Sequence, residues 1–105
     1  RNVVILTQPL GFRKKPDRML PLMKLYYRKY PKLLEAIASR HIHYNAALDE
    51  IARQEAAGEL LVIRPPEKLP IGRTENDPQK LRSVYETGRR TAEARMAEIR
   101  AYLGL

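Results

Sequence analysis

The sequence contains no cysteine and no tryptophan, and it has one phenylalanine and two histidines. The absence of cysteine excludes disulfides, thiolate metal sites and a cysteine nucleophile, and it is typical of a reducing compartment. No apolar run approaches the length of a transmembrane helix, and residues 1–8 are too short for the core of a signal peptide. A glycine-rich phosphate loop is also missing. We therefore expect a soluble, intracellular protein.

The composition is that of a globular chain with one strongly basic region. Of the 105 residues, 44% are hydrophobic and 30% are charged, and the net charge is +8. Residues 1–32 hold nine basic residues against one acid, Asp17, whereas the remainder holds eleven of each sign. The whole excess charge therefore lies in this first region, and we expect it to attract anions.

Two continuous apolar runs predict strands that are covered on both faces. Residues 2–8 contain VVIL and end before Pro9 and Gly11, and residues 60–66 read LLVIRPP. A long helical crossover between them predicts that they lie parallel. A two-stranded parallel sheet is not stable alone, and leaving residues 3–6 wet would forfeit about 6–12 kcal/mol. We expect further strands, from missing chain or from a partner subunit.

Residues 17–57 predict two helices. A short helix lies within DRMLPLMKLYYRKY, where Pro21 marks either the first turn or a kink. A second helix begins at Pro31 and runs to about Ala57, before Gly58. Its apolar spacing predicts one long buried stripe, formed by Leu34, Ile37, His41, Tyr44, Leu48 and Ile51.

Asp77 and Pro78 predict the start of a last helix over about residues 78–103, with an aspartate cap and proline in the first turn. Gly88 and Ala92 lie on its apolar side and predict a close approach to another element. The expected fold class is therefore α/β, a β-α-α-β-α fragment in which two buried parallel strands from a larger sheet carry a mostly helical cover. The apolar side consists of Leu81, Val84, Tyr85, Gly88, Ala92, Met96, Ile99 and Leu103.

Three blocks of sequence carry a resemblance to a known family. They are VVILTQPLGFRKKP, YYRKYPKLLEAIASRHIHYN and LLVIRPPEKLPIGRTENDPQKLRSVYETG. In their order and spacing they resemble the carboxyl-terminal region of bacterial patatin-like phospholipases, from Val3 to about Gly88. The resemblance implies that residues 1–105 are a single carboxyl-terminal domain or fragment, cut just ahead of a core strand, with the catalytic part upstream.

The resemblance also implies what this chain lacks. The family hydrolyses acyl esters of lipids with a Ser–Asp dyad, whose serine lies in G-x-S-x-G and whose aspartate lies in D-G-[GA]. Ser39 and Ser83 have no flanking glycine, and no aspartate is followed by glycine. We therefore expect no catalytic residue in this chain, and we expect the parent protein to be the lipid acyl hydrolase.

The basic region predicts a surface for anions. Aromatic and basic residues mix in FRKKP and YYRKYPK, and the simplest interpretation is a solvated basic face. The resemblance favours an anionic phospholipid surface, because each basic residue near such a membrane is worth roughly 1 kcal/mol. The alternative is a small basic nucleic-acid-binding module. The predicted membrane- or anion-binding residues are Phe12, Arg13, Lys14, Lys15, Arg28 and Lys29.

Two other polar groups are interpreted as structural. His41 and His43 point to nearly opposite sides of a helix and cannot share a metal, and His41 is expected to be a hydrogen-bonded core residue. Arg73, Glu75 and Asp77 could bind an anion, but a loop-ordering salt bridge and helix cap explain them better.

These interpretations define the expected partners and location. We predict no cofactor and no metal. The expected partners are the upstream catalytic part of the same polypeptide, an anionic phospholipid surface, and a second copy if the chain is isolated; the leading interpretation includes no nucleic acid. The resemblance implies a bacterial cytoplasmic protein that is peripheral at the inner membrane.

Overall fold

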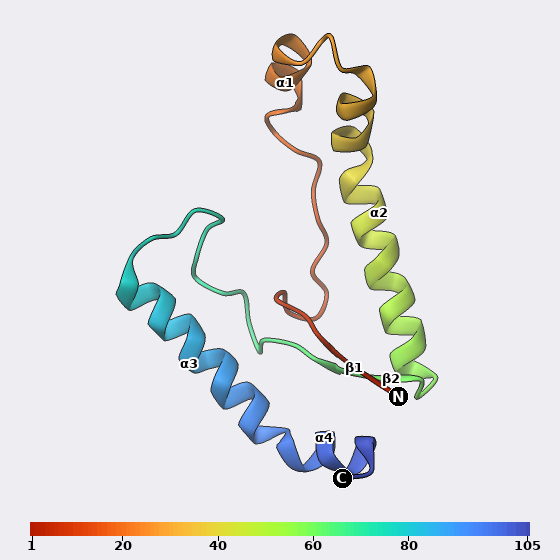
Figure 1. The fold of residues 1–105 in the computed structure, drawn as a ribbon, viewed down its shortest axis with the longest axis vertical. Helices are drawn as coiled ribbons and strands as arrows, with labels where there is room; N and C mark the ends of the chain where they lie inside the picture. Colours follow the sequence, from red (N-terminus) through yellow and green to blue (C-terminus); the bar gives the residue numbers. More distant parts are fainter. The chain divides into compact units, whose positions relative to one another are not determined.

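The computed structural model describes all residues from 1 to 105. It confirms a mixed α/β chain with two parallel strands. The predicted last helix is wrong in one respect, because it is divided in two. The elements in chain order are β1 (Asn2–Ile5), α1 (Leu20–Tyr26), α2 (Pro31–Ala56), β2 (Leu60–Ile63), α3 (Pro78–Ala94) and α4 (Met96–Leu103) (Figure 1).

The chain divides into two compact units. Residues 13–53 form one, which we call the hairpin unit because it contains α1 and most of α2. Residues 1–12 and 54–105 form the other, which we call the sheet unit. It contains both strands, α3 and α4.

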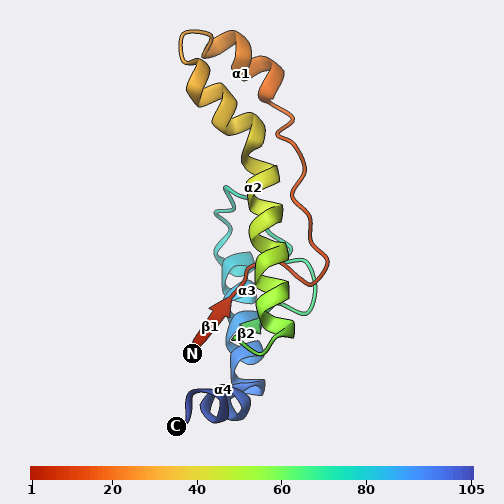
Figure 2. The same cartoon turned by 90° about the vertical axis from the view of Figure 1, so that its right-hand side faces the viewer.

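The strands of the sheet unit pair in parallel, from Asn2 opposite Leu60 to Ile5 opposite Ile63. Figure 2 shows β1 as an arrow that starts at the N-terminus. The Leu6 amide continues the ladder, donating to the Ile63 carbonyl at 2.9 Å. Both strands are shorter than predicted. Prolines follow each strand within a few residues and cannot donate to a ladder.

The core is confined to β2, which corrects the expectation of two buried strands. Leu60, Val62 and Ile63 are the buried hydrophobic residues of the chain, and Val62 is completely buried. Ile5 in β1 is 75% exposed, although it pairs with buried Ile63. One strand is therefore covered on both faces, whereas its neighbour is not.

The hairpin unit contains no buried residue. Pro21 lies in the first turn of α1, so the alternative of a kink is wrong. The irregular segment 13–17 runs beside α2, and a turn at residues 18 and 19 leads from it into α1 (Figure 1). The predicted buried stripe of α2 is only half-buried, and Tyr44 is 36% exposed. We call residues 13–17 the strap.

The predicted end of α2 is confirmed. Gly58 has a φ of 75°, a left-handed conformation that glycine adopts without strain. Its amide donates to the Glu55 carbonyl at 3.1 Å, and the Glu59 amide donates to the Gln54 carbonyl at 2.9 Å. These two bonds form a Schellman motif, which satisfies carbonyls at the end of the helix and turns the chain toward β2.

The start of α3 is as predicted, but its course is not. The Asp77 carboxylate accepts a hydrogen bond from the Gln79 amide at 2.9 Å, and Pro78 occupies the first turn. The helix ends before Arg95, whose φ of −110° and ψ of 9° leave helical geometry. A Cβ at Gly88 would meet nothing within 4 Å, so the predicted close approach there is wrong.

Candidate functional site

The predicted anion-binding loop is used as a strap on α2. The Lys14 amide donates to Asn45 Oδ1 at 2.8 Å, and Asn45 Nδ2 donates to the Lys14 carbonyl at 2.9 Å. One side-chain amide thus pairs with both polar groups of a backbone residue, as a neighbouring strand would. Asn45 lies beside the apolar stripe of α2, directly after Tyr44 and three residues before Leu48, and a polar residue at that place is the signal that could have identified its role.

Arg13 and Lys14 also use their side chains within the hairpin unit. Arg13 donates to the Asn45 carbonyl at 3.2 Å and forms an ion pair with Asp49, and the hydrogen bond to Asp49 raises the pKa of Arg13. The Lys14 ammonium lies 5.4 Å from the centre of the Tyr44 ring, in cation–π geometry. Both basic residues therefore have intramolecular partners.

Phe12 is half-buried and belongs to the sheet unit, whereas Lys15 is exposed. The Phe12 amide donates to the Pro9 carbonyl at 3.2 Å, in a turn beside Gly11. The six residues predicted for anion or membrane contact therefore do not form one group. Only Arg28 and Lys29 lie in the turn between α1 and α2.

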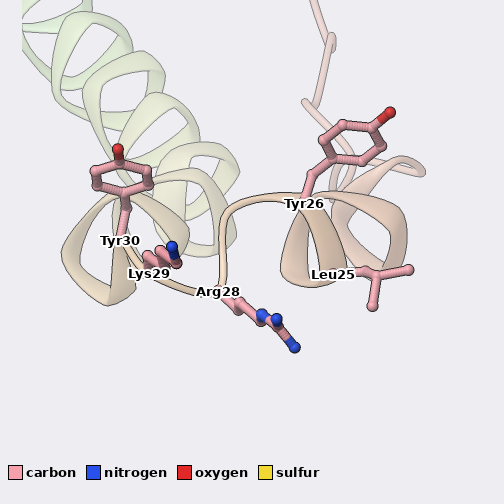
Figure 3. Close-up of a pocket in the computed structure, with 5 residues that line it drawn as sticks. All are labelled: Leu25, Tyr26, Arg28, Lys29 and Tyr30. Carbon is pink, nitrogen blue, oxygen red and sulfur yellow. The ribbon is translucent and has the colours of Figure 1, made fainter.

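That turn forms the candidate site. Arg28 and Lys29 line a shallow hollow of about 520 Å³ together with Leu25, Tyr26 and Tyr30 (Figure 3). Tyr26 and Tyr30 stand on either side of the turn and reach in the same direction, whereas Arg28 reaches the other way. Neither Arg28 nor Lys29 forms an ion pair, so their charges are available to a ligand.

The second predicted polar group orders the start of α3. Glu75 accepts a hydrogen bond from the Asp77 amide at 3.2 Å, and its carboxylate lies 3.9 Å from Lys80. Arg73 is exposed and takes no part in this ion pair. Asp77 caps the helix, as described above, so these side chains have local structural contacts.

The histidines and serines have no shared site. His41 is half-buried, and its Nδ1 is buried without a hydrogen-bond partner, which differs from the hydrogen-bonded core residue that was expected. His43 is exposed. The Ser39 hydroxyl donates to the Glu35 carbonyl of its own helix at 3.0 Å. No group of three or more histidine or acidic side chains is arranged to hold a metal ion.

A polar network in the sheet unit was not predicted from the sequence. Arg95 donates to the Val62 carbonyl at 2.6 Å and to both carboxylate oxygens of Glu98 at 2.8 and 2.9 Å. The Tyr102 hydroxyl donates to the Glu59 carbonyl at 3.0 Å. These contacts connect the segment from Arg95 to Tyr102 with β2 and with Glu59, the residue that precedes β2.

A second ion pair belongs to the same unit. Arg64 donates to both carboxylate oxygens of Glu55 at 2.8 and 2.9 Å. This hydrogen bonding lowers the pKa of Glu55, just as hydrogen bonding from Arg95 lowers the pKa of Glu98. Arg64 follows β2 directly and Glu55 lies in the last turn of α2, so this ion pair links the end of the strand to the end of the helix.

None of the helices is both long enough and apolar enough to cross a membrane. The fold is a small mixed α/β domain with two parallel strands.

Comparison with known proteins shows the family of the chain. Residues 30–104 match the profile of a domain of unknown function, DUF6363, and the chain belongs to that family. No curated protein and no solved structure matches the chain significantly.

Proposed function

We propose that this chain is the non-catalytic carboxyl-terminal part of a patatin-like phospholipase. In this proposal β1 and β2 complete the parallel sheet of an upstream catalytic part on the same polypeptide, and the Ser–Asp dyad lies in that part. The chain supports the fold of the hydrolase and assists its approach to membrane or substrate. The family resemblance motivates the proposal, and the unequal edges of the sheet support it.

The observation that carries the proposal is the difference between the two outer edges of the sheet. Successive carbonyls of a strand point to opposite edges. The Ile63 carbonyl accepts from Leu6 and so faces β1; the Val62 carbonyl therefore faces the outer edge of β2. Arg95 donates to that Val62 carbonyl. The outer edge of β2 is thus occupied by a side chain, which prevents another strand from pairing there.

The outer edge of β1 has no such cover. By the same alternation, the amides and carbonyls of Val3 and Ile5 point away from β2. The Ile5 side chain is also 75% exposed. Unpaired backbone beside an exposed β-branched residue is the arrangement that a further strand would complete. We therefore expect the upstream strand to pair with β1.

The reading frame that encodes this chain provides the test. The proposal expects G-x-S-x-G after a strand and D-G-[GA] shortly before NVVILTQ, in the same frame. A frame that lacks both motifs would rule out the patatin assignment. As a second readout, the purified 105-residue chain should hydrolyse no acyl ester, whereas the longer protein should do so.

Hydrogen exchange tests the edge assignment separately. In the longer protein the amides of Val3 and Ile5 should exchange at least about tenfold more slowly than in the isolated chain, because they gain partners. The Leu6 amide already donates to Ile63 and serves as the internal control. Equal exchange of Val3 and Ile5 in both proteins would contradict pairing at β1.

A further inference from the structure

The turn between α1 and α2 gathers large exposed side chains. Leu25, Tyr26 and Tyr30 are 69%, 79% and 60% exposed. Leu22 on α1 is 49% exposed. Single exposed apolar residues are ordinary, but a contiguous group rimmed by polar residues marks an interaction surface. The tyrosines combine an apolar ring with a hydroxyl, which suits a boundary between water and an apolar phase.

The charge around this group has a single sign. Residues 18–34 contain five basic residues and no acidic residue. The first turns of α1 and α2 likewise contain no acid. Arg28 and Lys29 are exposed and form no ion pair, unlike Arg13 in the strap. A partner that fits this surface must therefore be anionic, and it must also accept apolar side chains.

We propose that Leu25, Tyr26, Arg28, Lys29 and Tyr30, which we call the turn surface, dock the chain on an anionic phospholipid bilayer. The two tyrosine rings, which reach in the same direction, enter the interface, while the long side chains of Arg28 and Lys29 attract lipid phosphates around them (Figure 3). Long basic side chains keep their charge in water while their stems cover apolar surface, so both contacts form together. The hollow of about 520 Å³ lies between these groups.

The leucines favour a bilayer over a nucleic acid. Tyrosine and arginine can stack on bases, whereas an exposed aliphatic side chain gains most from burial in an apolar phase and little from a phosphate backbone. Leu22 and Leu25 are exposed, and they gain free energy when an apolar phase such as a bilayer removes them from water. The inference deepens the membrane approach of the proposed function, and its observations do not depend on the family resemblance.

A tryptophan reporter tests the docking. The chain has no tryptophan, so Tyr26→Trp introduces a single reporter in the turn surface. Tyr85→Trp is the matched control, because Tyr85 on α3 is also 61% exposed. With vesicles of phosphatidylcholine and phosphatidylglycerol, fluorescence of the Tyr26→Trp variant should shift to the blue and be quenched by brominated lipid. Fluorescence of the control variant should change much less. Equal quenching of the two variants would overturn the inference.

A charge-matched pair of variants tests the phosphate contacts. Arg28→Gln with Lys29→Gln should weaken vesicle binding about thirtyfold, because each basic residue near an anionic membrane strengthens binding about five- to sixfold. Arg82→Gln with Arg90→Gln on α3 removes the same charge and should weaken binding less than about threefold, since these residues lie outside the turn surface. Circular dichroism of each variant checks that helical content is unchanged. Equal weakening by both pairs would overturn the inference.

Two further arms separate lipid from other anions. Pure phosphatidylcholine vesicles should bind at least about tenfold more weakly, and about 1 M salt should remove most of the binding because it shortens the screening length from about 10 Å to about 3 Å. Tighter binding to duplex DNA than to anionic vesicles at equal salt would overturn the bilayer in favour of a nucleic acid. A negative result in these binding experiments would not affect the reading-frame test, so the docking proposal and the proposed function can be rejected independently.

Discussion

Each of the two units of this protein is stabilised internally, and the interactions that stabilise them differ. The sheet unit buries Leu60, Val62 and Ile63 and ties Arg95 to the backbone of β2. The hairpin unit buries no side chain and instead uses Asn45 to bind the backbone of a strap. Hydrogen bonds contribute about 0.5–1.5 kcal/mol each, whereas a fully buried aliphatic side chain contributes about 1.5–3 kcal/mol. The comparison teaches that stability is concentrated at β2, while the large exposed side chains of the hairpin unit are available to partners.

Val62→Ala should have the largest effect on stability. Val62 is completely buried, and removing two methyl groups leaves a cavity, so we expect a loss of about 1–3 kcal/mol in chemical denaturation. Ile5→Ala in the neighbouring strand is the control and should cost less than about 0.5 kcal/mol, because Ile5 is 75% exposed. Similar losses would contradict a core confined to β2. A larger loss for Ile5→Ala in the longer protein would indicate that another strand covers β1.

Arg95→Ala should destabilise the sheet unit by about 1–3 kcal/mol. The substitution leaves the Val62 carbonyl without its side-chain donor and removes the pairing with Glu98. It should also open the outer edge of β2 and increase self-association, measured by light scattering after gel filtration. Arg90→Ala, on the exposed surface of α3, is the matched control and should change neither property. An Arg95→Ala chain that stays as monomeric as Arg90→Ala would argue against edge protection.

Asn45→Ala should loosen the strap of the hairpin unit by about 1–2 kcal/mol, since two hydrogen bonds to Lys14 are lost. Hydrogen exchange of the Lys14 amide should accelerate about tenfold. Asn45→Asp keeps the acceptor for that amide but loses the donor to the Lys14 carbonyl, so its effect should be smaller. Asn76→Ala in an exposed loop is the control. Unchanged Lys14 exchange in Asn45→Ala would show that the strap is held elsewhere.

Acid should weaken the sheet unit slightly through Glu55. Hydrogen bonding with Arg64 lowers the pKa of Glu55 in the folded chain. The resulting stability is fully present above the pKa of an unperturbed glutamate, about 4.3, and is lost as the pH falls through the lowered value. We expect a contribution below about 1 kcal/mol, because the pair is partly solvated. Carboxyl NMR titration measures the pKa directly, and Glu55→Gln should flatten the acid limb of the stability curve.

Local features of the sequence were sufficient to locate both strands, the starts of α2 and α3, and the end of α2. Pro31, Asp77 and Gly58 act through their own backbone geometry and near neighbours, so their roles can be read without the tertiary structure. Only part of the candidate site could be predicted from the sequence. Arg28 and Lys29 reach the turn surface, whereas Arg13 and Lys14 find partners on α2 that are distant in the sequence.

The sequence by itself determined where apolar runs, prolines and glycines begin and end the elements, because these effects act over a few residues. Only the tertiary structure decided which strand is buried, why the last helix divides at Arg95, and which basic residues remain available. Arg95 meets the Val62 carbonyl across the sheet unit, and Asn45 on α2 meets Lys14 in the strap. Such contacts depend on which segments come together in space, and no local pattern of residues specifies that.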